Sequence, residues 1–277
     1  MCTIAVMRSL HPRYPLLVAA NRDEFYARHA TAPVALGRTR GGDVIVAGQD
    51  STAGGSWMGA TARGFFVGVT NQRTGFPAVV GRRSRGEVVR DALYEGTVDG
   101  VLALLERTDP SQFNPFNLVF GDASDLRVAY ARDRPASVEV HALGAGTHVL
   151  TNDRIGSALF PKAERARALL DPVTLAALDD DALLARFARA LADHEVPDDT
   201  PDLPGETLFP QEIARRLQAL CIHTPVYGTV SSTAMLLTAA GVARYRYASG
   251  SPCVTPMTER SGEFLRAPEE DPLAHWR

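Results

Sequence analysis

The first two dozen residues constrain the fold more than any other stretch, because two short apolar runs lie there on either side of a turn. Residues 1–7 and 14–20 are typical of strands, and the segment between them carries two arginines and Pro12, which suit an exposed turn. If the strands pair as a hairpin, Cys2 lies opposite roughly residues 21–23, with opposed Cβ atoms ~4.5–5.5 Å apart. We therefore expect the Cys2 thiol to face the polar end of the neighbouring strand.

Cys2 has the chemistry of an N-terminal nucleophile. Initiator methionine is usually removed before a small residue such as cysteine, which would leave Cys2 with a free α-amine beside its thiol. The amine has a reference pKa of ~7.7–8.0 and can act as a base toward a thiol with a reference pKa of ~8.5. The alternative is an incidental cysteine at this position. The four polar residues 21–24 at the facing strand end favour the nucleophile.

Composition excludes several classes of protein. The chain has 277 residues and a net charge of −3, which gives no basic footprint for nucleic acid. No stretch approaches the ~18 uninterrupted apolar residues of a membrane span, and Arg8 interrupts the short N-terminal apolar run, unlike a signal peptide. Three cysteines are few and odd in number, which fits a reducing compartment, so we expect a cytoplasmic protein.

The rest of the chain alternates between blocks of strands and blocks of helices. A Ser-x-x-Glu capping box at residues 84–87 predicts the start of one helix. The predicted strands are 44–47, 56–60, 65–70, 117–120, 127–131, 138–142, 148–151, 229–238 and 242–248. The predicted helices are 85–94, 98–107, 162–170, 181–194 and 211–220. This order favours two sheets between helix layers over alternating βαβ units, and no glycine-rich phosphate loop follows a strand.

Short motifs occur along the chain in a specific order. They are Cys2, then NRDE at 21–24, GGSWMG at 54–59, TNQR at 70–73, SRGE at 84–87, LTN at 150–152 and YGT at 227–229. In this order they resemble the NRDE family, also called the transport and Golgi organisation protein 2 family, over nearly the whole chain. That family is similar to the choloylglycine hydrolases and penicillin V acylases, a branch of the N-terminal nucleophile (Ntn) hydrolases. The resemblance implies an α+β fold, a four-layer αββα sandwich with two antiparallel sheets, formed by one domain over residues 1–277.

The resemblance also implies catalytic roles for four residues. Cys2 matches the nucleophile of the acylases, and Asp23 matches the aspartate that orients the nucleophile and its amine. Asn71 matches an asparagine whose amide stabilises the tetrahedral oxyanion, and Asn152 matches one that hydrogen-bonds near the α-amine and the substrate. Neutral amide N–H groups suit an oxyanion because they are fixed donors.

Other residues of these motifs are expected to bind substrate or support the site. Asn21 and Trp57 belong to this group, and Arg22 and Glu24 are interpreted as a supporting ion pair, because strand alternation turns Arg22 away from the face of Asp23.

Two arginines of the acylases are missing from this chain. Ala20 stands where the acylases have an arginine, and Val230 stands where many family members have another. Either the role of the second arginine is lost, or another residue supplies it. Arg73 is our candidate for that substitute.

The expected function is hydrolysis of a non-peptide C–N amide bond in a small acylated metabolite, through a thioester on Cys2. The competing hypothesis is a non-catalytic binding protein that handles haem, lipid or acyl-CoA, as suggested for relatives. No cofactor is expected, and no metal either. Cys221 and His223 could form half of a metal site, but no second Cys/His pair has zinc spacing, so we expect a structural role for them.

Overall fold

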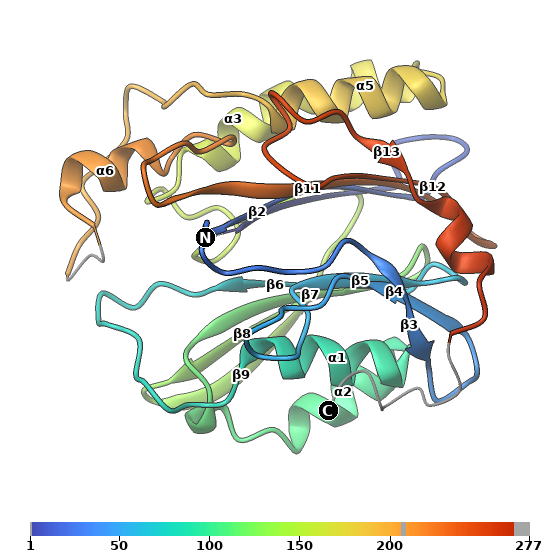
Figure 1. Ribbon diagram of the computed structural model, residues 1–277, viewed down its shortest axis with the longest axis horizontal. Coiled ribbons are helices and arrows are strands. Elements are labelled where there is room, and N and C mark those ends of the chain that lie inside the picture. Colours follow the sequence, from blue (N-terminus) through green and yellow to red (C-terminus); the bar gives the residue numbers. More distant parts are fainter. Residues whose placement is uncertain (1, 206–208, 269–277) are drawn as a thin grey trace.

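The computed structural model describes residues 2–205 and 209–268, which form two antiparallel sheets packed face to face (Figure 1). Met1, the first residue of one predicted strand, lies outside the described residues. The first sheet has the strand order β10 (Gly146–Leu150), β1 (Cys2–Arg8), β2 (Leu16–Phe25), β11 (Tyr227–Thr238), β12 (Gly241–Ala248) and β13 (Thr258–Glu259). The second has the order β3 (Val34–Arg38), β4 (Val44–Ala47), β5 (Met58–Thr61), β6 (Phe66–Asn71), β7 (Phe116–Gly121), β8 (Leu126–Asp133) and β9 (Ala136–Ala142).

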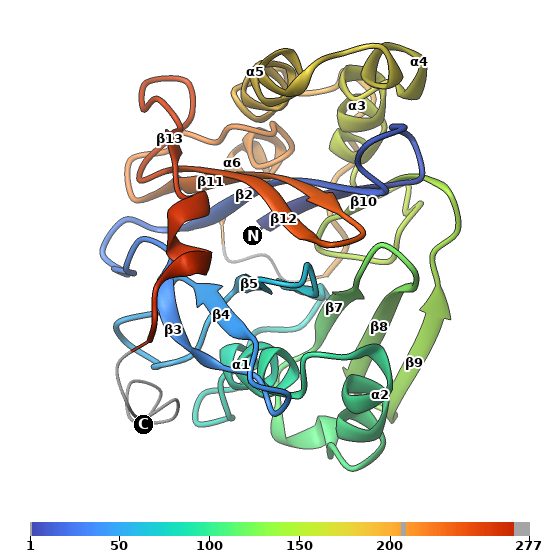
Figure 2. The ribbon, with the colours of Figure 1, turned by 90° about the vertical axis from the view of Figure 1, so that its right-hand side faces the viewer.

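Helices cover the outer face of each sheet, which completes the αββα sandwich and confirms the expected fold class (Figures 1 and 2). On the first sheet lie α3 (Lys162–Leu169), α4 (Pro172–Ala176) and α5 (Asp180–Leu191). The short α6 (Gln211–Arg216) packs its buried Ala214 against Phe160 and Leu203. On the second lie α1 (Arg85–Glu95) and α2 (Val98–Glu106). Within residues 2–205 and 209–268, none of the helices combines the length and apolar character that crossing a bilayer requires.

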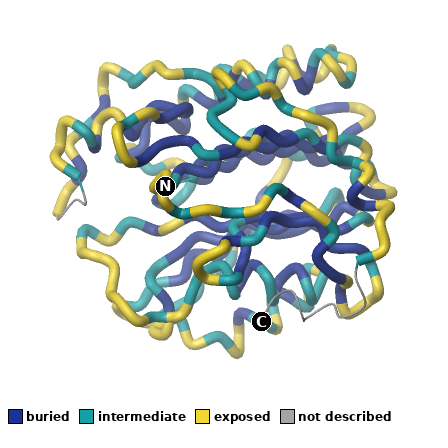
Figure 3. Tube along the Cα trace, in the orientation of Figure 1, coloured by how far each residue is buried: buried dark blue, intermediate teal, exposed yellow. Residues whose placement is uncertain are grey.

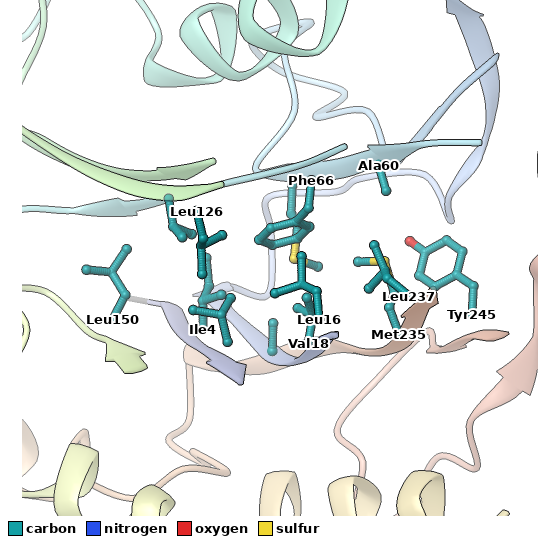
Figure 4. Close-up of a cluster of buried hydrophobic side chains, with 14 of the residues drawn as sticks. Ile4, Leu16, Val18, Ala60, Phe66, Leu126, Leu150, Met235, Leu237 and Tyr245 are labelled. Carbon is teal, nitrogen blue, oxygen red and sulfur yellow. The ribbon is translucent and has the colours of Figure 1, made fainter. Parts of the chain in front are cut away.

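The central strands are buried (Figure 3). They are apolar on both faces, because each face packs on a different layer. In β1, Ile4 points into the cluster between the sheets, where it meets Leu16 and Phe66 (Figure 4). Its neighbour Ala5 belongs to the cluster formed with the helices above the first sheet. A Cβ at Gly68 of β6 would lie 2.8 Å from Ile4 Cδ1, so glycine allows β1 to approach β6 closely beside the strand end that carries Cys2.

The N-terminal hairpin pairs as predicted, with Cys2 directly opposite Arg22. However, β2 continues to Phe25, so the predicted strand end at residue 20 is wrong and the NRDE tetrapeptide lies inside the strand. Pairing with β11 explains this extension, because Asp23 and Glu24 face Thr229 and Gly228 there. The polar residues continue the sheet at the point where the two strands leave the apolar core.

Two predicted helices end earlier than expected. The helix predicted over 181–194 ends at Leu191, and the one predicted over 211–220 ends at Arg216. Asn21 Nδ2 donates hydrogen bonds of 2.8 Å to the carbonyl oxygens of both Leu191 and Leu220. A distant side chain thus satisfies backbone acceptors at these positions, which periodicity along the chain does not reveal.

Candidate active site

The Cys2 thiol faces a small pocket between the two sheets. The pocket offers about 10 Å³ to the centre of a water molecule, which is room for roughly one water. Burial and the charge of Asp23 raise the pKa of the Cys2 thiol, whereas a backbone hydrogen bond from Asp23 and the charge of Arg22 lower it. The side chains around the thiol include those of Arg22, Trp57, Met58, Ser231 and Thr233.

Arg22 lies on the Cys2 side of the strand end. Its guanidinium lies 4.6 Å from the centroid of the Trp57 ring and forms a buried ion pair of 3.5 Å with Asp50. Glu24 pairs instead with Arg28, at 3.3 Å, and Arg28 also contacts Asp50 at 2.8 Å. The predicted Arg22–Glu24 ion pair is therefore wrong. Arg22 and Glu24 lie on the same face of β2, but each pairs with one member of the Arg28–Asp50 ion pair rather than with the other.

Asp23 is buried on the opposite face of β2, toward the helices. Its Oδ1 accepts a hydrogen bond of 2.7 Å from Thr229 Oγ1, and its backbone carbonyl accepts one of 2.8 Å from Tyr227. Burial raises the pKa of the Asp23 carboxyl, and the positive charge of Lys162 and the Thr229 hydrogen bond oppose this shift. The carboxylate is thus held by neighbours that favour its charged form.

Lys162 is a site residue that the sequence did not reveal. It is fully buried at the start of α3, and Nζ donates a hydrogen bond of 3.1 Å to the carbonyl of Leu217. Burial lowers the pKa of Lys162, while the nearby Asp23 and Cys2 raise it. A lysine in the first turn of a polar helix is normally predicted to be exposed, and the helix dipole disfavours a positive charge at that end. Its burial beside Asp23 follows only from the tertiary fold.

Asn71 and Asn152 lie next to each other. Asn152 is buried, and its Nδ2 donates a hydrogen bond of 2.9 Å to the backbone carbonyl of Asn71. Asn152 follows the end of β10, which pairs with β1 so that Leu150 faces Ile4, two residues from Cys2. The Asn71 side chain is exposed at the end of β6, where it is accessible to a bound molecule.

Neither Arg73 nor Val230, the two positions considered for the missing arginine, lines the pocket at Cys2. Arg73 donates a hydrogen bond of 2.9 Å to the carbonyl of Pro204. Val230 is the extra residue of a β-bulge in β11, between the residues that pair with Asp23 and Arg22. The pocket contacts the neighbouring Ser231 rather than Val230. Arg85, which the sequence did not single out for the site, lies close enough to Cys2 for the cysteine to raise its pKa against the lowering effect of burial.

The fold is that of the Ntn hydrolases. A solved structure of the Caenorhabditis elegans N-acylethanolamine-hydrolyzing acid amidase ortholog matches it with a TM-score of 0.53 and 15% sequence identity. The match covers 85% of this chain and 92% of that chain. At this identity the likeness defines the architecture, two antiparallel sheets between helices, with Cys2 beginning a central strand.

The family model described as Transport and Golgi organisation 2 matches residues 1–247, and the chain belongs to this family. The Bos taurus Transport and Golgi organization protein 2 homolog is 31% identical over 248 residues, covering 82% of this chain and 84% of the bovine protein. The Homo sapiens homolog is 30% identical over 246 residues, with the same coverage. The family resemblance drawn from the motifs is thereby confirmed.

Proposed function

We propose that this chain is a cysteine Ntn amidohydrolase that cleaves a non-peptide C–N bond of a small acylated metabolite. The observation that carries the proposal is the position of Cys2, which begins β1 directly beside the Asp23-bearing end of β2. A nucleophile needs an adjacent base and a group that orients the base. The α-amine of processed Cys2 supplies the first, and the buried Asp23 carboxylate supplies the second.

The reaction follows from these groups. The α-amine takes the thiol proton, and the sulfur attacks the amide carbonyl to form a C–S bond. The oxyanion of the tetrahedral intermediate accepts hydrogen bonds from the Asn71 amide, whose backbone is held by Asn152. The C–N bond then breaks, and the leaving amine takes the proton from the α-ammonium. Water, deprotonated by the same amine, hydrolyses the thioester and releases the carboxylic acid.

The positive charges around the site support this chemistry. Arg22 faces the thiol and lowers its pKa, which increases the thiolate fraction at neutral pH. Lys162 lies on the other side of the strand and favours the ionised form of Asp23. The two cations therefore act on different groups, one on the nucleophile and the other on the residue that orients its base.

The experiment begins with the intact mass of the purified protein, which should show loss of Met1. Incubation with a panel of electrophilic amides and β-lactams, followed by peptide mapping, should then give an acyl adduct on Cys2 that Cys2→Ala lacks. A matched control carries an uncleavable extension before Cys2, so that the thiol remains but the free amine is lost. The extended protein should acylate at least ~10²-fold more slowly, the scale of general base catalysis.

Two outcomes would reject the catalytic proposal. Retention of Met1 in the active protein would remove the base, and equal acylation of the extended protein would show ordinary thiol reactivity. The binding-protein hypothesis makes the opposite prediction, because a carrier of haem or lipid would keep its ligand affinity in the Cys2→Ala variant.

A further inference from the structure

A second cluster of nucleophilic side chains lies beyond the Ntn site, next to the start of β11. His194, Cys221, His223 and Cys253 each contribute one nitrogen or sulfur atom, and these atoms all lie within 4.8 Å of one another. Cys221 is buried, and the other residues are exposed at the surface. Two of the chain's three cysteines therefore meet two of its seven histidines at one point.

We propose that these four side chains bind a Zn²⁺ ion in a closed tetrahedral Cys₂His₂ site. The Sγ atoms of Cys221 and Cys253 are 3.7 Å apart, and His223 Nε2 lies 3.7 Å from the first and 3.3 Å from the second. Zinc–sulfur bonds of ~2.3 Å and zinc–nitrogen bonds of ~2.0–2.1 Å give tetrahedral edges of ~3.8 Å between sulfurs and ~3.6 Å between sulfur and nitrogen. The three atoms thus already have the spacing of one face of a zinc tetrahedron.

His194 provides the fourth ligand through a fixed tautomer. Its Nδ1 lies 3.0 Å from the backbone carbonyl oxygen of Cys221. Because a carbonyl oxygen can only accept, Nδ1 must carry the proton of this hydrogen bond. Nε2 is then unprotonated and available to the ion. Metal-binding histidines commonly donate their second ring nitrogen to a backbone carbonyl in this way. Here the acceptor belongs to another ligand of the cluster.

The donor set selects zinc over the other common ions. Thiolate and imidazole ligands in tetrahedral arrangement suit Zn²⁺, whereas Mg²⁺ and Ca²⁺ require oxygen ligands. Two thiolates also neutralise the charge of the ion. A disulfide between the cysteines is the competing chemistry, but its bond length of ~2.05 Å would require the two sulfurs to move closer by more than 1 Å.

Spacing along the chain hides this site, which is why the sequence indicated no metal. Cys221 and His223 are two residues apart, while His194 precedes Cys221 by 27 positions and Cys253 follows it by 32. No second Cys/His pair with zinc-finger spacing occurs in the sequence. The fold instead brings in one ligand from the segment after α5 and one from the loop after β12.

The proposed ion would fix the backbone behind Asp23. Between the ligands Cys221 and His223, the N–H of Ile222 donates a hydrogen bond of 2.9 Å to Thr229 Oγ1, the hydroxyl that binds Asp23. On the Cys253 side, Ser251 Oγ donates one of 2.7 Å to the Thr229 carbonyl. Zinc would join both segments to His194, in the segment that follows α5. We therefore assign it a structural role, with four protein ligands and no open position for catalysis.

The test measures metal in the whole protein, purified under reducing conditions without chelator. Elemental analysis should find one zinc per chain, and Co²⁺ exchange should give the visible absorption of tetrahedral cobalt with thiolate ligands. The Cys221→Ser/Cys253→Ser double variant should lose both signals, and Cys2→Ser should retain them. Chelation should lower the melting temperature of the wild-type protein by about 5–10 °C, and added Zn²⁺ should restore it.

The wild-type cobalt spectrum keeps the proposal testable even if the double variant fails to fold. Reduced wild-type protein that contains no zinc and gives no thiolate–cobalt absorption would overturn the proposal. So would zinc that remains after both cysteines are replaced. Peptide mapping that finds a Cys221–Cys253 disulfide in protein isolated under reducing, anaerobic conditions would assign the cluster to redox chemistry instead. None of these readouts depends on amidase activity, so the zinc proposal can fail while the Cys2 mechanism stands.

Discussion

Thr229 Oγ1 donates a hydrogen bond of 2.7 Å to Asp23 Oδ1 and accepts one of 2.9 Å from the backbone N–H of Ile222. Because Thr229 Oγ1 accepts the hydrogen bond from the Ile222 N–H, its own proton points to the Asp23 carboxylate. Thr229 therefore does more than fill space in β11. It donates its proton to the Asp23 carboxylate, the group that we propose orients the Cys2 amine.

Replacing Thr229 by valine should impair the site through Asp23. Valine has a similar shape but no donor, so the pKa of Asp23, already raised by burial, rises further. Less of the carboxylate is then ionised at low pH, and the acidic limb of the acylation profile should move to higher pH. The unfolding free energy should fall by about 1–3 kcal/mol, since a buried acceptor loses its partner. Thr229→Ser should restore the wild-type pH profile. If the acidic limb of Thr229→Val were unchanged, the ionisation of Asp23 would not control the base.

Replacing Lys162 by methionine should make stability depend on pH in a defined direction. Lys162 is the largest of the influences that oppose the raised pKa of Asp23, so its loss raises that pKa further. A carboxyl whose folded-state pKa exceeds its unfolded value favours folding when protonated, and that contribution is lost as pH rises through the folded-state pKa. The variant should therefore lose stability between mildly acidic and neutral pH, as measured by urea unfolding.

The control for that measurement is Arg167→Gln, which removes from the same helix a half-buried cation that pairs with the exposed Glu164. We expect its stability difference from wild type to stay nearly constant over the same pH range, because exposed ion pairs contribute little. A flat profile for Lys162→Met as well would show that Lys162 and Asp23 do not interact strongly.

Replacing Arg22 by glutamine should lower the reactivity of the Cys2 thiol at neutral pH. Burial raises the pKa of this thiol, and Arg22 lowers it, so removal of the guanidinium shifts the pKa upward and reduces the thiolate fraction. Peptide mapping can follow the rate of iodoacetamide alkylation at Cys2 across pH. The pH profile of this rate should shift toward alkaline pH in the variant. Asp50 keeps Arg28 as a partner at 2.8 Å, which should preserve the fold. Arg28→Gln is the control and should leave the profile close to wild type.

Replacing Asn71 by alanine should slow acylation by on the order of 10²–10³-fold, the effect of losing one oxyanion donor. The backbone carbonyl that accepts from Asn152 is retained in this variant, so the local structure should survive. Asn114→Ala is a suitable control, because that side chain pairs with the Val79 backbone outside the site. Single-turnover kinetics with the best substrate of the amide panel would measure both. Equal rates for Asn71→Ala and wild type would leave Asn71 without a catalytic role.

The sequence predicted the parts of the fold that local chemistry determines. The capping box at Ser84 forms as expected and begins α1 at Arg85, and the N-terminal hairpin has the predicted register. β3 escaped prediction because Gly37 and an irregularity in its pairing with β4 interrupt the strand, and α4 because it has only 5 residues, too few for a helical period.

The site was predictable where it follows family motifs and hidden where it depends on tertiary contacts. Asn71 and Asn152, which the motifs singled out, are joined by a hydrogen bond from the Asn152 amide to the Asn71 carbonyl. Lys162 carries no local sign of burial, because the feature that makes it special is the carboxylate of Asp23 on another element. The same holds for the pairing of Arg22 with Asp50, since 28 positions separate the two residues.

The alternation of side chains along β2 has a consequence for how this protein can change. Asn21 and Asp23 face the helices, while Arg22 between them faces the second sheet. A one-residue deletion or insertion within the strand would exchange these faces, so that an amide met the Cys2 pocket and a guanidinium entered the helix layer. Length variation among relatives should therefore be confined to residues 9–15, between β1 and β2. Within β2 itself, substitutions can accumulate, but the number of residues must stay fixed.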